Sequence, residues 1–287
     1  MASLRDIRRR IASIKNTQQI TKAMKMVAAA KMKKAQGAIL SARPYAKKMH
    51  TVLSSLAART GEEAHPLLRV REEDRVGMIV LTSDRGLCGG FNTAICRQAL
   101  QFLKEQKQKQ NQVTLYVIGK KGRNFFKSRG ISMDKVFVDI SGKVQYKDAA
   151  EIAGEMVGQF EREDLDAIYI VYNEFKSAIS QRVVVERLLP VEPIEITPGM
   201  NAVEYLYEPS EQDVLTHILP KYVETQVFRA FLESEASEQG ARMTAMDSAT
   251  NNAADMIRLL TLNMNKARQA QITKEISEIV GGAEALK

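Results

Sequence analysis

Both ends of this chain have the apolar period of long helices that pack lengthwise against another helix. From Lys221, just after Pro220, to Val280 there is no proline and only one glycine, so a helix here could reach about 90 Å. Its apolar positions alternate in steps of three and four, as in the contact stripe of a coiled coil: Met243, Met246, Thr250, Ala253, Ile257, Leu260, Met264 and Ala267. The C-terminal end is therefore predicted to be a coiled-coil helix.

Beyond Ala267 the register of the stripe slips. Ile272, Ile276 and Ile279 continue it to the pair of glycines at 281–282, and we expect the helix to stop there.

The N-terminal end supplies a partner for that helix. Apolar residues step by three and four from Leu4 to Ile14, and Ile20, Met24 and Val27 resume the stripe after three extra residues, which indicates local overwinding. We expect this helix to run to about Arg43, where Pro44 should bend or end it. Because a whole domain separates the two helices, they are predicted to pair antiparallel, with the C-terminal helix overhanging.

Charge is concentrated in the first helix. Residues 1–50 hold thirteen Lys or Arg against the single acid Asp6, a net of +12, although the whole chain carries only +8. Such a face is either simply solvated, or a nucleic-acid contact, or a contact with an acidic protein surface. Residues 1–44 contain no aromatic side chain for base stacking, which weighs against nucleic acid.

The composition favours a soluble, intracellular protein. No apolar run approaches the roughly 20 residues of a membrane span, and the start lacks the apolar core of a signal peptide. Cys88 and Cys96 are too few for a disulfide framework, and we expect them to be reduced packing residues.

The middle of the chain reads as an α/β domain, residues 75–195. Strands alternating with helices favour a mostly parallel, Rossmann-like sheet. The expected strands are Arg75–Leu81, Val113–Ile118, Val136–Ile140, Ala167–Tyr172 and Arg182–Leu189, and the expected helices are Phe91 to about Lys109, Gly122–Lys127 and Asp148–Glu161.

Little in this domain indicates catalysis. The loop 82–90 lies where a dinucleotide-binding fold would hold a phosphate, but its G-x-x-G-G spacing matches neither phosphate-binding motif. A tight strand-to-helix turn is the simpler interpretation. His50, His65 and His217 stand singly, without nearby cysteines or carboxylates in metal-ligand spacing. We predict no catalytic residue, no cofactor and no metal.

Four segments nevertheless carry a close resemblance that covers the whole chain: LRDIRRRIASIKNTQQITKAMKMVAAAKMKKAQ at the start, SDRGLCGGFN, YLYEPS, and SEQGARMTAMDSATNNAADMI near the end. They resemble the γ subunits of bacterial F-type ATP synthases. The resemblance implies a long antiparallel coiled coil of the terminal helices with an inserted Rossmann-like α/β domain, divided as 1–57, 75–195 and 210–287.

The resemblance also implies a function that needs no catalytic residue of this chain. The coiled coil would be the central-stalk rotor inside a ring of α and β subunits. Proton flow would turn a ring of c subunits and with it the shaft, which would drive the catalytic β subunits through their conformations for ATP synthesis, or for hydrolysis in reverse. The ε subunit would sit on the α/β domain. The chain would lie peripherally on the cytoplasmic side of the cell membrane, attached only through the membrane sector.

Site residues follow from the same resemblance. Two sets of contacts with the α/β ring are expected. A polar set would sense β closure: Arg9, Lys22, Met24, Lys25, Arg268, Gln269 and Thr273. An apolar set at the end of the helix would turn in a collar: Ile276, Ile279 and Val280. The foot on the c ring is expected at Tyr205, Tyr207 and Glu208.

Some alternatives stay open on the residues alone. Ile276 and its neighbours could be ordinary seam residues, and the two tyrosines ordinary packing. A nucleic-acid-binding coiled-coil protein and a Rossmann-type nucleotide-binding enzyme are the alternative functions. The chain lacks the cysteine-bearing insertion of the chloroplast proteins, so we expect no thiol switch.

Overall fold

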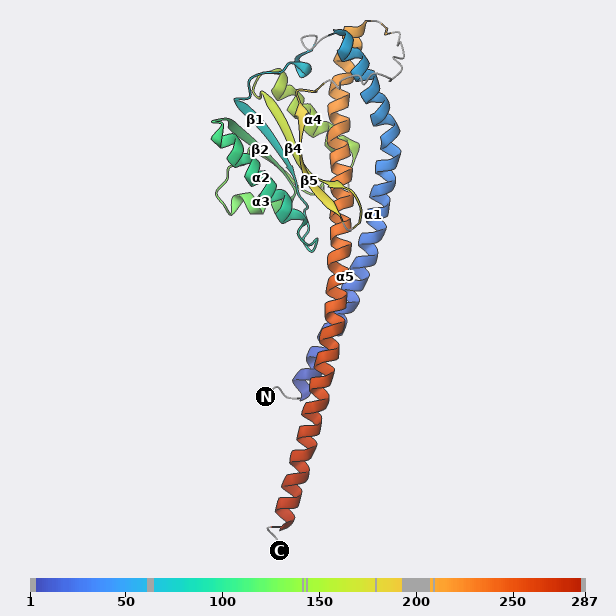
Figure 1. Cartoon of the computed structure of the whole chain (residues 1–287), viewed down its shortest axis with the longest axis vertical. Helices are drawn as coiled ribbons and strands as arrows, with labels where there is room; N and C mark the ends of the chain where they lie inside the picture. The colour runs from blue at the N-terminus through green and yellow to red at the C-terminus, as the bar shows by residue number, and fades with distance from the viewer. Residues whose placement is uncertain are drawn as a thin grey trace. The chain divides into compact units, whose positions relative to one another are not determined.

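The computed structural model describes residues 4–60, 65–140, 142, 144–178, 180–192, 207–208 and 210–284. The chain divides into two compact units: unit 1 comprises Met1–Ala28 with Met243–Lys287, and unit 2 comprises Ala29–Arg242. Two long helices, α1 (Leu4–Thr60) and α5 (Glu211–Glu284), contribute to both units (Figure 1). The predicted long terminal helices are therefore confirmed.

Unit 2 contains a five-stranded sheet in the order β3-β2-β1-β4-β5. The strands β1, β2, β3 and β4 run parallel, and β5 pairs antiparallel with β4 at one edge. The strands are β1 Arg75–Leu81, β2 Gln112–Ile118, β3 Lys135–Phe137, β4 Ala167–Phe175 and β5 Gln181–Leu189. The mostly parallel, Rossmann-like sheet is thus confirmed, with one antiparallel edge strand.

The sheet is covered on both faces. The helices α2 and α3 pack on one face around Ile95, Phe102 and Phe126. On the other face α4 packs together with the first part of α5, around Ile152, Phe160 and Leu219. The covering elements are α2 Phe91–Gln108, α3 Lys120–Lys127, α4 Tyr146–Glu161 and the short 3₁₀ helix η2 Pro66–Leu68. Because both faces are buried, the central strand β1 is apolar along almost its whole length.

Two prolines lie inside the long helices. Pro44 is within α1, which continues to Thr60, and Pro220 is within α5. Of the two outcomes predicted at Pro44, a bend or an end, the end near Arg43 is therefore wrong. The loss of one backbone hydrogen bond at each proline is offset by packing on either side.

The start of α5 has a local cause. Ser210 Oγ accepts a hydrogen bond from the backbone N–H of Asp213 at 3.1 Å, the geometry of an N-cap. At the other end the glycines at 281–282 do not stop the helix, which continues to Glu284.

The helices of unit 1 pair antiparallel, as predicted. The hydroxyls of Thr21 and Thr250 lie 2.8 Å apart, and Lys25 Nζ lies 2.6 Å from Asp247 Oδ1. Residue numbers therefore increase along α1 where they decrease along the facing part of α5. The predicted α5 seam, from Met243 to Ala267, is buried or half-buried throughout.

The predicted seam of α1 is wrong at Ile20 and Val27, whereas Met24 is half-buried. Ile20 and Val27 are 60% and 57% exposed, whereas Thr21 and Ala28 are buried. The steps of three and four seen from Ile7 therefore continue without interruption, and no overwinding is needed. Polar Thr21 can occupy the seam because Thr250 satisfies its hydroxyl.

Candidate functional site

The carboxyl edge of the sheet, where a Rossmann-type enzyme would bind its ligand, is covered by α5. Ser237 Oγ donates to the carbonyl of Asn173 at 3.1 Å, and Arg242 Nη2 donates to the carbonyl of Gly86 at 3.2 Å. A Cβ at Gly240 would lie 3.1 Å from the carbonyl oxygen of Ala178. The chain's own helix therefore fills the space that a nucleotide would need.

The loop after β1 is also satisfied internally. Ser83 Oγ donates to the carbonyl of Arg85 at 2.6 Å, and Asn92 Oδ1 accepts from the Ser83 N–H at 2.9 Å. Asp84 Oδ1 accepts from the backbone N–H of Lys120 at 3.0 Å. These contacts make the tight strand-to-helix turn that the glycine spacing favoured.

The histidine and the two cysteines of interest in unit 2 have structural roles. His65 caps η2, where its Nδ1 accepts from the Leu67 N–H at 3.1 Å, and burial lowers the pKa of its imidazole. Cys88 and Cys96 are buried free thiols, and burial raises the pKa of Cys96 to about 11. Among the described residues, no cluster of three or more His, Cys, Asp or Glu could hold a metal ion. No helix in the described part of the chain is long and apolar enough to cross a membrane.

The exposed end of α5 is the first candidate contact surface. From Arg268 to Ala283 every residue is exposed, and we call the segment Arg268–Val280 the C-terminal surface. Its three predicted collar residues, Ile276, Ile279 and Val280, are 56%, 71% and 59% exposed. Thr273 Oγ1 donates to the carbonyl of Gln269 at 3.0 Å, within the helix. The predicted overhang is therefore present, and the alternative that Ile276 and its neighbours are seam residues does not hold within unit 1.

The second candidate surface lies on α1 in unit 1. Lys22 is exposed and Met24 is half-buried. Lys25 is already paired with Asp247, both side chains being a little less than half exposed. Arg9 is exposed and pairs with Asp6 at 3.0 Å. Of the two lysines beside Met24, Lys22 is therefore the more exposed.

Unit 1 does not bring the two groups of predicted ring contacts together. Lys25 lies beside Asp247 and Thr21 beside Thr250, whereas Arg268 is 18 residues further along α5 than Thr250. At 1.5 Å per residue the separation is about 27 Å. Met24 and Arg268 therefore belong to different levels of the coiled coil.

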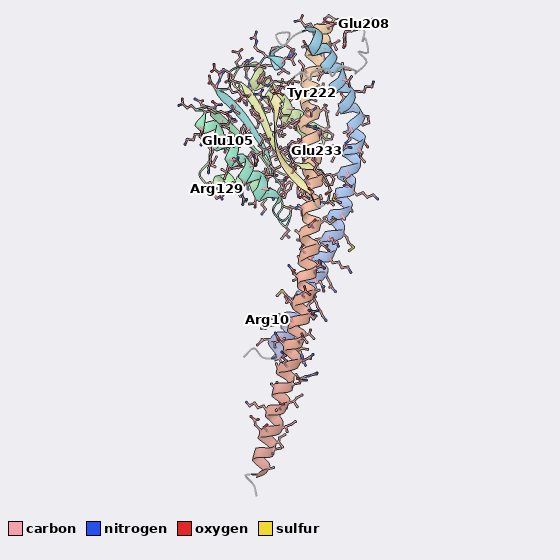
Figure 2. All side chains as sticks on the ribbon, viewed as in Figure 1. Arg10, Glu105, Arg129, Glu208, Tyr222 and Glu233 are labelled. Carbon is pink, nitrogen blue, oxygen red and sulfur yellow. The ribbon has the colours of Figure 1, made fainter. Side chains whose placement is uncertain are left out.

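The predicted foot residues lie near the start of α5. Tyr207 packs against the apolar core of unit 2, and Glu208 is exposed just before α5 (Figure 2). Tyr205 lies outside the described residues.

Sequence reasoning missed a further set of exposed apolar side chains in unit 1. These are Met26, Met256, Leu259 and Leu262, which are 61%, 53%, 59% and 55% exposed. Together with Ile20 and Val27, they place apolar side chains on the outer surface of the paired helices as well as in the seam. The sequence contained this information. On α1, Met26 lies off the stripe that continues from Ile7, and on α5, Met256, Leu259 and Leu262 lie off the stripe predicted from Met243 to Ala267. Exposed apolar surface of this extent marks an interaction site.

These features define a class: a coiled-coil protein whose exposed helical surfaces bind other proteins. The family model described as ATP synthase matches residues 3–286. Full-length relatives include the ATP synthase gamma chains of Pelotomaculum thermopropionicum and Desulfitobacterium hafniense, 53% and 52% identical over 287 residues, with each chain covered completely.

Solved structures agree with this match. A chain of the Tetrahymena thermophila mitochondrial ATP synthase central stalk and c ring is 28% identical with a TM-score of 0.61, over 80% of this chain and 99% of that one. A Euglena gracilis mitochondrial ATP synthase chain shares the fold at 22% identity, with a TM-score of 0.71 over 99% and 94%. The chain belongs to the ATP synthase gamma-chain family. It is accordingly a non-catalytic subunit, the rotor of the central stalk.

Proposed function

We propose that the coiled coil of this chain turns inside a ring of α and β subunits and transmits the rotation of a c ring to the catalytic β subunits. Proton flow would drive ATP synthesis in this way, and ATP hydrolysis would drive the reverse rotation. Each orientation of the rotor must bind one arrangement of β conformations better than the others, because only a difference in binding free energy shifts an equilibrium.

The observation that carries this proposal is the set of exposed apolar side chains on the C-terminal surface, Ile276, Ile279 and Val280 among them. Apolar side chains that a helix presents to solvent, with no covering element among the described residues of unit 1, indicate a sleeve from another molecule. Ile276, Ile279 and Val280 offer no polar group. Apolar contact is non-directional, so a collar around these residues could hold the shaft while allowing it to rotate.

The polar contacts divide into two levels. We assign Lys22 and Met24, with Lys25 beside them, to the contact with an acidic segment of a β subunit, since opposite charge sets orientation and encounter rate. Arg268, Gln269 and Thr273 begin 21 residues beyond Asp247, the partner of Lys25, or about 32 Å along α5. They would contact a different level of the ring, with Arg9 on the α1 side.

The remaining partners belong to unit 2. Tyr205, Tyr207 and Glu208 would form the foot on the c ring, and the α/β domain would carry the ε subunit. In functional terms the chain would divide at 1–57, 75–195 and 210–287. It would be held peripherally at the cytoplasmic side of the cell membrane through the c ring.

Co-expression with the α and β subunits of the same organism tests this proposal. We expect a stable complex containing a single copy of this chain, and ATPase activity that falls when residues 276–287 are deleted or when Met24→Lys is introduced. Gln101→Lys on the exposed face of α2 is the matched control and should leave activity unchanged. Failure to enter the complex, with retention on DNA or nucleotide resin instead, would contradict the proposal.

A further inference from the structure

Unit 2 contains a cavity of about 360 Å³ between α1 and α5. Its α1 wall includes Ile39, Ala42 and Ala46, and its α5 wall lies within residues 225–233. The helices are in contact beside the cavity, where Ile39 belongs to the same apolar cluster as Leu232. The small side chains at positions 42 and 46 leave the following turns of the two helices unfilled.

The walls of the cavity are mainly apolar. Phe228 lines it from α5, as do Arg229 and Glu233. The Arg229 guanidinium is directed at the sheet, where it pairs with Glu186 of β5. The Glu233 carboxylate is directed at the backbone of Phe175 in β4, and Figure 2 labels Glu233 on α5. Both side chains therefore offer the cavity aliphatic stems, while their charged ends serve the contact with the sheet.

One cation at the cavity has no such use. Arg43 lines the cavity and is exposed, so it marks the side that opens to solvent. No ion pair among the described residues involves Arg43, and residues 1–50 contain no acid except Asp6. A guanidinium matches the geometry of a carboxylate and can bind it through two hydrogen bonds. The opening of the cavity therefore favours an anionic group.

We propose that this cavity binds a single-chain alkyl carboxylate of medium length, with its chain among Ile39, Ala42 and Phe228 and its carboxylate at Arg43. The volume is sufficient, because a cavity of about 150 Å³ already accepts benzene and ligand pockets begin at about 300 Å³. The chain supplies most of the affinity, at about fourfold for each buried methylene. The exposed pair with Arg43 adds a smaller factor and sets the direction of the head. The site lies within unit 2 and does not depend on the ring contacts proposed for unit 1.

Titration of octanoate into the full-length chain tests the site, with the Ile39 methyl resonance as the reporter. We expect a saturable shift below the concentration at which octanoate forms micelles. Hexanoate should bind about 15-fold more weakly, because it lacks two methylenes. Ala42→Phe should fill the cavity and abolish the shift, as should Ala46→Leu if the first variant folds poorly. Ala30→Phe, on the exposed face of α1, should leave it intact.

The head group is tested by changing its charge and that of its partner. Arg43→Gln should weaken octanoate by about threefold, leave octanol unchanged and strengthen octylamine, because only a charged head senses the guanidinium. Lys33→Gln removes a charge from an exposed position of α1, ten residues before Arg43 and away from the cavity lining. It is the matched control and should leave all three affinities unchanged.

Four results would overturn the proposal. No saturable shift with octanoate, or a shift that survives both cavity-filling variants, would mean that the cavity is not the site. Equal affinity for hexanoate and octanoate would mean that the chain is not buried. Equal weakening of octanol and octanoate by Arg43→Gln would mean that Arg43 shapes the cavity and does not bind the head. A shift caused by phosphatidylglycerol vesicles but not by octanoate would assign this surface to a lipid bilayer instead.

Discussion

A buried ion pair within α5 holds the arginine that binds the loop after β1 in unit 2. Arg242 Nη2 lies 2.7 Å from Glu238 Oε1, and the two side chains are only 11% and 6% exposed. The same guanidinium donates to Gln239 Oε1 at 3.0 Å and to the carbonyl of Gly86 at 3.2 Å. Glu238→Ala would therefore leave a buried positive charge with neutral partners only.

We expect Glu238→Ala to lower the free energy of unfolding of unit 2 by about 3–5 kcal/mol, the usual cost of removing one partner of a buried pair. The exposed pair of Arg162 and Asp164 in the same unit, at 3.1 Å, provides the control: Asp164→Ala should cost less than about 1 kcal/mol. Replacing both members, as Glu238→Leu with Arg242→Met, should cost much less than the single change, because no uncompensated charge remains.

The assay can isolate unit 2. The chain has no tryptophan, and all its tyrosines and phenylalanines lie within Ala29–Arg242. Near-ultraviolet circular dichroism during urea unfolding therefore reports this unit alone. A change below about 1 kcal/mol in Glu238→Ala, or an equal loss in the double variant, would refute the reasoning.

Three further predictions concern unit 2. Gly122→Ala places a Cβ 2.7 Å from a threonine hydroxyl and should lower the free energy of unfolding by about 1–3 kcal/mol. Gly154→Ala, in open space within α4, should raise it by about 0.5–1 kcal/mol. Urea unfolding measures both changes, and equal effects would contradict the argument. Burial lowers the pKa of His65 below its ordinary value of 6.5. The folded state therefore binds fewer protons than the unfolded state, and stability should fall as pH drops from about 7 to about 5. His65→Asn should flatten that dependence in thermal melts, and an unchanged slope would count against it. Burial raises the pKa of Cys96 from 9.0 to about 11. Its alkylation by iodoacetamide at pH 8 should therefore be at least about 100-fold slower in the folded chain than in the urea-unfolded chain. Mass spectrometry follows the reaction, and similar rates in the two states would disprove this.

The sequence predicted those parts of the fold that depend on a residue's own neighbours. The strand Arg75–Leu81 was predicted with its observed bounds, because a continuous apolar run bounded by polar residues has few other interpretations. The helix from Phe91 was predicted to within a residue. Pro44 suggested that the first helix bends or ends there, but the helix continues to Thr60, because tertiary packing outweighs a single lost hydrogen bond.

The register of α1 could not be read from one helix alone. Apolar Ile20 and Val27 were assigned to the seam, but Thr21 fills it because Thr250 on the other helix satisfies its hydroxyl. The same partner contacts fix which levels of α1 and α5 meet. The exposure of Ile276 and Ile279 followed from the expected overhang, whereas the separation of Met24 from Arg268 needed the observed alignment of the two helices.

Observed rotation is the most direct test of the central claim. Cys88 and Cys96 are buried, so a single cysteine introduced by Gln101→Cys on α2 would accept a probe selectively in a complex with surface-fixed α and β subunits. We predict that the probe turns in one direction when ATP is added, and that deleting residues 276–287 reduces the torque. A complex that hydrolyses ATP at its full rate while the probe stays fixed would contradict the assignment of this chain as a rotor.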